Sequence, residues 1–136
     1  MQITRQADYA VRAVRYLAKV YSQNPTDKHV STYHVAEEMK IPPSFLAKII
    51  SQLQIAGLLT TSRGARGGVW LAHEPKDISL LEVVEAIDGP VLLNECVGSS
   101  KPCVFEDECL VHPVWIEAQE NLVNHLRSTR FDTLHN

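Results

Sequence analysis

The chain has 136 residues, of which 45% are hydrophobic and 21% charged, and it carries a formal net charge of −3. This length suits one domain or a small domain with an appendage, and no apolar run approaches the roughly 20 residues that span a bilayer. The composition therefore indicates a globular protein and excludes a membrane span. The first ten residues lack the apolar core of a signal peptide, so we expect a cytoplasmic protein.

The charge is divided unevenly along the chain. Residues 1–76 contain ten lysines or arginines and five acidic residues, giving +5. The remaining residues contain three basic and eleven acidic residues, giving −8. A basic half of this kind suits contact with phosphates even in a protein of negative net charge. The alternative is an ordinary solvated surface, which charge alone does not exclude.

Three helices are predicted in the first 55 residues. The first follows Thr4, a suitable N-cap, and has apolar residues at helical spacing up to Tyr21. The second is short and occupies residues 31–40. The third has proline in its first turn, where the missing N–H costs little. Its apolar side consists of Leu46, Ile49, Ile50 and Leu53.

A β-hairpin is predicted next, with strands at residues 58–61 and 69–71. The segment that joins them is SRGARGG. A strand follows these glycines, whereas a phosphate-binding loop or a dinucleotide fingerprint requires a helix at that point. A tight turn with its backbone close to DNA is therefore the better interpretation, and the alternative is that the glycines serve the turn alone.

The rest of the chain predicts two further helices, from about Leu80 to Ile87 and over Pro113–Ser128. Between them, residues 94–109 show neither helical nor strand period and are predicted as loop. The fold class is therefore mainly α with a small β-hairpin wing. We divide the chain into a winged helix-turn-helix DNA-binding domain at residues 1–78, and a sensing loop with a long C-terminal helix at residues 79–136.

The second and third helices have the spacing of a helix-turn-helix, with the small Ala36 at their close crossing. In such a module the second helix enters the major groove, and arginines of the hairpin reach phosphates or the minor groove. The alternative is a three-helix module for protein contact. We find no nucleophile with a base-orienting partner nearby in the sequence, so an enzyme has little support. The predicted DNA contacts are Ser44, Lys48, Ser51, Gln52, Arg63 and Arg66.

All three cysteines, Cys96, Cys103 and Cys109, fall within 14 residues of polar sequence, and His112 follows. An odd number of cysteines is a poor disulfide framework, and the alternative of buried free thiols does not suit so polar a stretch. Three thiolates and one further ligand satisfy either tetrahedral zinc or an iron-sulfur cluster, and the spacing does not choose between them. The acidic residues 106–108 would repel a phosphate backbone, which disfavours an RNA-binding zinc finger.

Four segments together resemble the Rrf2 family of winged-helix transcriptional regulators, which includes iron-sulfur sensors of the IscR and NsrR type. They are ITRQADYAVRAVRYLA, LLTTSRGARGGVWLA, SLLEVVEAIDGP and the cysteine triplet that ends in CLVH. The resemblance covers essentially the whole chain. It implies a homodimer paired through the Pro113–Ser128 helix, a near-palindromic DNA operator, and an iron-sulfur cluster whose state governs DNA binding. The alternatives are a clusterless regulator that responds to thiol oxidation or a metabolic partner, and a zinc-stabilised regulator of the same fold.

The resemblance offers two candidates for the fourth cluster ligand. In IscR-like members a histidine shortly after the third cysteine completes a 2Fe-2S site, and His112 stands there. In NsrR-like members an aspartate from the partner's first helix completes a 4Fe-4S site, and Asp8 matches it. The opening segment is closer to NsrR, which favours Asp8 and a 4Fe-4S cluster. Each residue has a structural alternative, since Asp8 can pair with Arg12 and His112 can cap the last helix.

Two positions depart from the family pattern. IscR-like proteins read a cytosine through an acidic residue of the recognition helix, and Ala47 stands at the matching position. A different operator is therefore expected. Glycine is common in the turn between the two helices, and Lys40 stands there instead, so we expect a small local strain.

Overall fold

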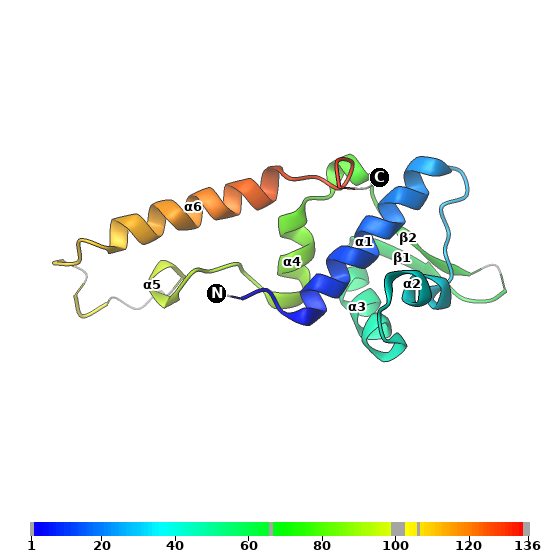
Figure 1. The fold of residues 1–136 in the computed structure, drawn as a ribbon, viewed down its shortest axis with the longest axis horizontal. Helices are drawn as coiled ribbons and strands as arrows, with labels where there is room; N and C mark the ends of the chain where they lie inside the picture. Colours follow the sequence, from blue (N-terminus) through cyan, green and yellow to red (C-terminus); the bar gives the residue numbers. More distant parts are fainter. Residues whose placement is uncertain (1, 66, 99–102, 106, 135–136) are drawn as a thin grey trace.

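The computed structural model describes residues 2–65, 67–98, 103–105 and 107–134. Figure 1 shows a helical body with a hairpin at one end and an elongated arm at the other. The body comprises residues 4–88 together with 129–134, and the arm comprises the described part of residues 89–128. None of the helices in the described ranges is long and apolar enough to cross a membrane. The elements in chain order are α1 (Arg5–Gln23), α2 (Thr32–Met39), α3 (Pro43–Ile55), β1 (Leu59–Ser62), β2 (Gly68–Leu71), a 3₁₀ turn (Pro75–Asp77), α4 (Leu80–Asp88), α5 (Glu95–Gly98) and α6 (His112–Ser128).

The helices of the body form where the apolar spacing predicts them. The Thr4 side chain accepts a hydrogen bond from the N–H of Ala7 at 3.1 Å, so the predicted N-cap of α1 is confirmed. Ser31 caps α2 in the same way, through the N–H of His34. The predicted apolar side of α3 is buried against α1, which contributes Ala10, Ala13, Val14 and Leu17 to the same core.

The turn between α2 and α3 depends on Lys40. Its φ of 56° and ψ of 43° place it in the left-handed region, and no other non-glycine residue in the described ranges has a positive φ. A residue with a Cβ pays about 1–2 kcal/mol for this conformation. The strain expected from a lysine at this glycine position is therefore present in the backbone.

The hairpin is attached to the body through Val30, the residue before the N-cap of α2. Val30 and Val69 exchange two backbone hydrogen bonds of 3.0 and 2.8 Å. A Cβ on Gly68 would lie 2.6 Å from the Val30 carbonyl oxygen, and one on Gly67 would collide with the Ser62 carbonyl oxygen. These two glycines are therefore explained by packing within the hairpin and its attachment.

The chain returns to the body after α6. The N–H of Phe131 donates to the Ile78 carbonyl at 3.1 Å, and the N–H of Leu80 donates to the Thr129 carbonyl at 2.9 Å. The Phe131 side chain is completely buried in the main core, together with Ile78 and Val83. The core is thus continuous across residue 78, so packing does not separate residues 1–78 from residues 79–136.

The arm differs from the sequence prediction at one point. Residues 94–109 were expected to be loop throughout, but Glu95–Gly98 form the short helix α5, so the prediction is wrong there. Contacts on both sides of α5 surround this helix. Gln119 of α6 donates to the Val91 carbonyl at 2.5 Å and accepts from the N–H of Leu93 at 2.9 Å. Gly98 lies so close to the Leu92 side chain that a Cβ would collide with it.

Candidate functional site: a DNA-reading surface and a cysteine arm

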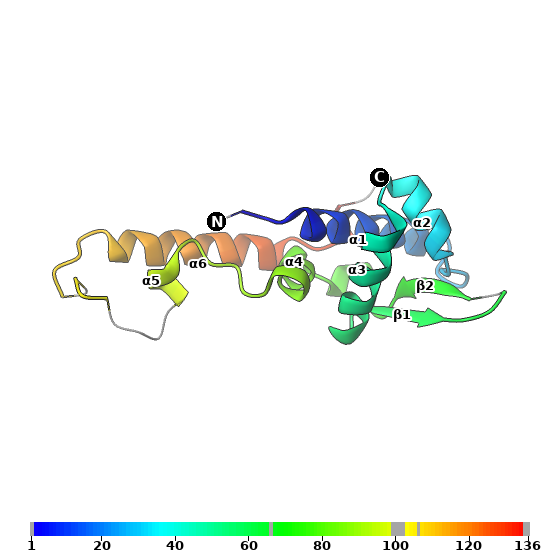
Figure 2. The same cartoon turned by 90° about the horizontal axis from the view of Figure 1, so that it is seen from below.

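The exposed side of α3 carries most of the residues predicted to contact DNA. Ser44, Lys48 and Ser51 are exposed, because the opposite side of the helix is fixed in the core. Gln52 is half-buried, and its Oε1 is buried without a hydrogen-bond partner among the described residues. Arg63 is exposed in the hairpin, which Figure 2 shows extending from the body beside α3. Arg66 lies outside the described residues.

A chain of contacts joins α1 to the first turn of α3. The Arg12 guanidinium pairs with the Asp8 carboxylate at 2.7 Å, and both side chains are about half exposed. The same guanidinium lies 5.2 Å from the centre of the Tyr9 ring. That ring in turn lies 6.1 Å from the ring of Phe45, centre to centre. Asp8 is therefore connected through the Arg12 and Tyr9 side chains to Phe45 in the first turn of α3.

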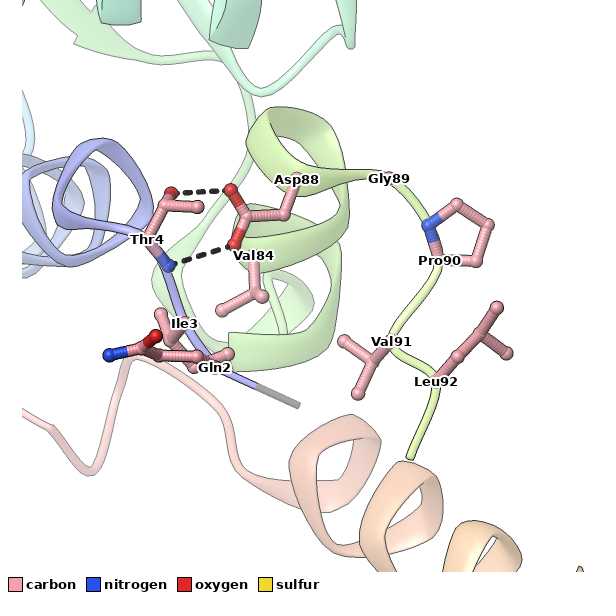
Figure 3. A pocket seen from close by; sticks show the side chains of 9 residues that line it. All are labelled: Gln2, Ile3, Thr4, Val84, Asp88, Gly89, Pro90, Val91 and Leu92. Carbon is pink, nitrogen blue, oxygen red and sulfur yellow. Dashed lines mark hydrogen bonds between the residues drawn. The ribbon is translucent and has the colours of Figure 1, made fainter. Parts of the chain in front are cut away.

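The start of α1 is also tied to the end of α4. The backbone N–H and the hydroxyl of Thr4 donate to the two carboxylate oxygens of Asp88, at 3.2 and 2.5 Å. Figure 3 shows both bonds at the edge of a hollow of about 220 Å³, with Ile3, Val84 and Val91 around it. Because the arm leaves the body directly after Asp88, this contact lies where the arm meets α1.

The three cysteines are all free thiols on the arm. Cys96 is half-buried on α5, where its thiol donates to the Asn94 side chain at 3.1 Å. Cys103 is exposed. Cys109 is half-buried before α6, and its sulfur accepts the backbone N–H of His112 at 3.3 Å. Backbone N–H bonds of this kind are among the contacts that tune cluster-binding thiolates.

The donor set has the chemistry of an iron-sulfur or zinc site, with three thiols and a nearby imidazole. In the part of the chain that the structure describes, no three candidate ligands lie close enough together to hold a metal ion. The three thiols and the imidazole therefore suit an iron-sulfur cluster or zinc by residue type and by their location on one arm. To bind one metal group together, the thiols would have to lie closer to each other than they do in this structure.

The two candidates for a fourth ligand lie in different parts of the molecule. His112 is the first residue of α6, three positions after Cys109 and in backbone contact with its sulfur. Asp8 lies on α1, and Figures 1 and 2 both show α1 in the body, away from α5 and from the start of α6. Within one chain only His112 is beside the cysteines, so Asp8 would have to meet the cysteines of a second copy.

The outer part of the arm presents apolar side chains to solvent. The helix α6 has no buried residue, and Leu122, Val123 and Leu126 in its second half are only partly buried where they pack against Leu81 and Val84 of α4. An exposed apolar surface of this kind marks an interaction site more often than an ordinary surface. The side chains concerned are Val104 (93% exposed), Leu110 (90%), Phe105 (67%), Val114 (58%), Val111 (50%) and Trp115 (41%).

Residues 3–136 match the Rrf2 family, described as an iron-dependent transcriptional regulator. The HTH-type transcriptional regulator NsrR of Shouchella clausii is 34% identical over 87% of this chain and 77% of its own length. The regulator IscR of Xenorhabdus nematophila is 30% identical over 98% of this chain and 79% of its own length.

Two solved structures share the fold over 98% of this chain. IscR of T. potens is 26% identical, with a TM-score of 0.74 over 86% of its chain. CymR, the global cysteine regulator of B. subtilis, is also 26% identical, with a TM-score of 0.79 over 95% of its chain. The predicted mainly helical fold with a hairpin wing is confirmed, and the relatives are regulators and not enzymes. The chain belongs to the Rrf2 family of winged-helix transcriptional regulators.

Proposed function

We propose that this regulator is a homodimer whose binding to a near-palindromic DNA operator depends on an iron-sulfur cluster held by Cys96, Cys103 and Cys109. One observation carries the proposal. All three thiols are free and lie on a single arm, joined to the DNA-reading body through α4. When bound, such a cluster supplies a centre that responds to redox and iron status. On the DNA side, Ser44, Lys48, Ser51 and Gln52 of α3 and Arg63 and Arg66 of the hairpin are the proposed contacts.

For the fourth ligand we propose Asp8 of a second copy, with a 4Fe-4S cluster. Its carboxylate is 53% exposed and therefore accessible to another chain. The apolar outer part of the arm supports pairing of two copies, since a dimer would cover it. The alternative is His112 with a 2Fe-2S cluster, supported by its position beside Cys109.

The contacts of α1 supply a route from Asp8 to the DNA. If Asp8 binds the partner's site, the charge that holds Arg12 changes, and Arg12 lies against Tyr9, which contacts Phe45. Phe45 follows Ser44 directly and stands three residues before Lys48 in the first turn of α3, so a shift there moves Ser44 and Lys48. The Thr4–Asp88 bonds hold α1 to the end of α4, where the arm begins. The role of these residues is to orient α3 and not to bind DNA.

The first test is anaerobic purification of the whole protein, with iron, sulfide and zinc analysis and visible and Mössbauer spectroscopy. We expect a coloured protein with iron and sulfide, and loss of both in Cys103→Ser. Binding of the wild type and this variant to an operator selected from random DNA should differ. A colourless protein with stoichiometric zinc would overturn the cluster and favour the zinc-stabilised alternative.

A clusterless regulator is the second candidate function. The likeness to CymR, the global cysteine regulator of B. subtilis, favours it, as does the lack of a preformed three-ligand group among the described residues. The same purification distinguishes it, because such a protein contains neither iron nor zinc. Its DNA affinity would then respond to thiol oxidation or to a metabolic protein partner.

The second test compares Asp8→Ala with His112→Ala, and each has a matched control. Asp27→Ala removes another exposed aspartate of the basic half, and His125→Ala removes an exposed histidine of α6. If Asp8 is the ligand, only Asp8→Ala alters the Mössbauer spectrum and the stability of the cluster in air. An unchanged cluster in Asp8→Ala together with a changed one in His112→Ala would assign the site to His112.

A further inference from the structure

An apolar hollow lies between α2 and α3, beside the residues proposed to contact DNA. Its volume is about 240 Å³, and Tyr33 and Ala36 of α2 line it opposite Pro43, Ala47 and Ile50 of α3. No charged side chain of the described residues lines it. A hollow without cations does not suit a phosphate, because phosphates are bound by lysine, arginine and N–H donors.

The hollow opens on the solvent-exposed side of α3. Ala47 is exposed, as is the neighbouring Lys48, and Tyr33 is 73% exposed. Leu46, only 1% exposed, forms the buried side of the hollow. Its two walls are the two helices of the helix-turn-helix, so a base edge that meets α3 in a major groove also meets this opening.

Ala47 determines which chemistry the hollow recognises. The helix Pro43–Ile55 contains no aspartate or glutamate, so it has no carboxylate to accept a hydrogen bond from the amino group of cytosine. A methyl side chain instead makes apolar contact with the 5-methyl group of thymine. Of the four bases of DNA, only thymine presents this methyl in the major groove.

We propose that the hollow receives the 5-methyl group of a thymine in each half-site, and that Ala47 and Tyr33 are specificity-determining residues. The proposal rests on the DNA-reading role proposed above and adds the base that this role selects. Removing the methyl from that thymine should weaken binding about fourfold, which corresponds to the burial of one methyl-sized group. Thymines elsewhere in the operator should show no such effect.

The test begins with selection of an operator from a random duplex pool by the full-length protein. Each thymine of the selected half-site is then replaced in turn by deoxyuridine, which pairs identically but lacks the methyl group. Equilibrium affinities are measured by fluorescence anisotropy at one fixed salt concentration, since phosphate contacts make affinity salt-dependent. We expect one position at which deoxyuridine raises Kd about fourfold.

Two variants test whether the hollow binds the methyl group of that thymine. Tyr33→Ala removes an exposed wall, and we expect thymine and deoxyuridine to bind it almost equally. Ala47→Glu introduces a carboxylate, and we expect its selected operators to carry cytosine in place of thymine there. Ala56→Glu is the matched control, because it adds the same charge at the exposed C-cap of α3, away from the hollow. This control should weaken binding without changing the preferred base.

Different outcomes overturn different statements. If the pool yields no enriched duplex, the proposed DNA-reading role fails, and this inference fails with it. If an operator is enriched but no thymine is sensitive to loss of its methyl, only the hollow's role is overturned. The same holds if a sensitive thymine keeps its full effect in Tyr33→Ala, a substitution at an exposed side chain that leaves the core intact.

Discussion

The body and the arm of this regulator are built in opposite ways. Each of the long helices of the body buries one side, and Leu17, Leu46 and Leu53 are at most 2% exposed. Neither α5 nor α6 has a buried residue, although α6 is nearly as long as α1. The body therefore has a core of its own, whereas the arm leaves apolar side chains and the Cys103 thiol exposed. The difference indicates that the buried packing that stabilises the fold is concentrated in the body.

The largest contrast should come from two phenylalanines. Phe131 is completely buried in the body's core, and Phe105 on the arm is 67% exposed. Phe131→Ala should lower the free energy of unfolding by about 3–5 kcal/mol, because it removes a buried ring and leaves a cavity. Phe105→Ala should change it by less than about 0.5 kcal/mol. Urea unfolding followed by circular dichroism measures both, and equal effects would contradict the division into body and arm.

Removal of the metal should affect function more than fold. Chelation of iron from the anaerobic protein should change the operator Kd by about 5- to 150-fold, the usual range of coupling between two sites. The helical content of the body should remain, because none of its core residues lies on the cysteine loop. Anisotropy and circular dichroism on one sample separate the two effects. Cooperative loss of the body's helices on chelation would instead indicate a metal that holds the whole fold together.

The cap of α4 provides a smaller test within the body. The Ser79 hydroxyl accepts the N–H of Glu82 at 3.1 Å, and the Glu82 carboxylate accepts the N–H of Ser79 at 2.8 Å. Ser79→Ala should cost about 1 kcal/mol, since it removes a buried N-cap. Ser51→Ala, at an exposed position of α3, should be nearly neutral in stability. A neutral Ser79→Ala would mean that Glu82 alone holds the start of the helix.

A substitution in the left-handed turn at Lys40 should stabilise the protein, whereas Phe131→Ala and Ser79→Ala should destabilise it. Lys40→Gly should raise the free energy of unfolding by up to about 1 kcal/mol, because glycine adopts positive φ without steric cost. Lys48→Gly, the same substitution inside α3, should lower it by about 1 kcal/mol. Thermal unfolding of the pair measures both signs. Destabilisation by Lys40→Gly would show that the lysine side chain compensates for its strained backbone.

The sequence predicted the body well because local patterns determine its helices. Leu46, Ile49 and Leu53 recur at helical spacing, and this spacing alone places them on one buried side. The Ser79-x-x-Glu82 pattern is also a local signal, that of a capping box at the start of α4. Phe131 could not be placed in this way, because its hydrogen-bond partner Ile78 lies more than 50 residues earlier in the chain.

The arm was harder to predict because its contacts join residues that lie far apart in the chain. The helix α5 has no period of its own, Gly98 packs closely against Leu92, and Gln119 of α6 holds the backbone of the segment just before α5. The three cysteines and His112 could be selected as candidate ligands by residue type alone. Asp8 could not be assigned from one chain, since its ion pair with Arg12 satisfies it locally while a role in the cluster requires a second copy.

The backbone pairing of residues 78–80 with residues 129–131 holds the arm to the body. It would therefore set the distance between the α3 helices of two paired copies. The arm leaves the body after Asp88 and returns at Thr129, so it is fastened near both ends of α4. Leu81 and Val84 of α4 pack against Leu122 and Leu126 of α6, so the arm is also held to the body by apolar contacts. In a dimer joined through α6, the two recognition helices then stand at one fixed separation. Inserting about 5 bp, half a helical turn, between the half-sites of the operator should therefore abolish binding to both at once.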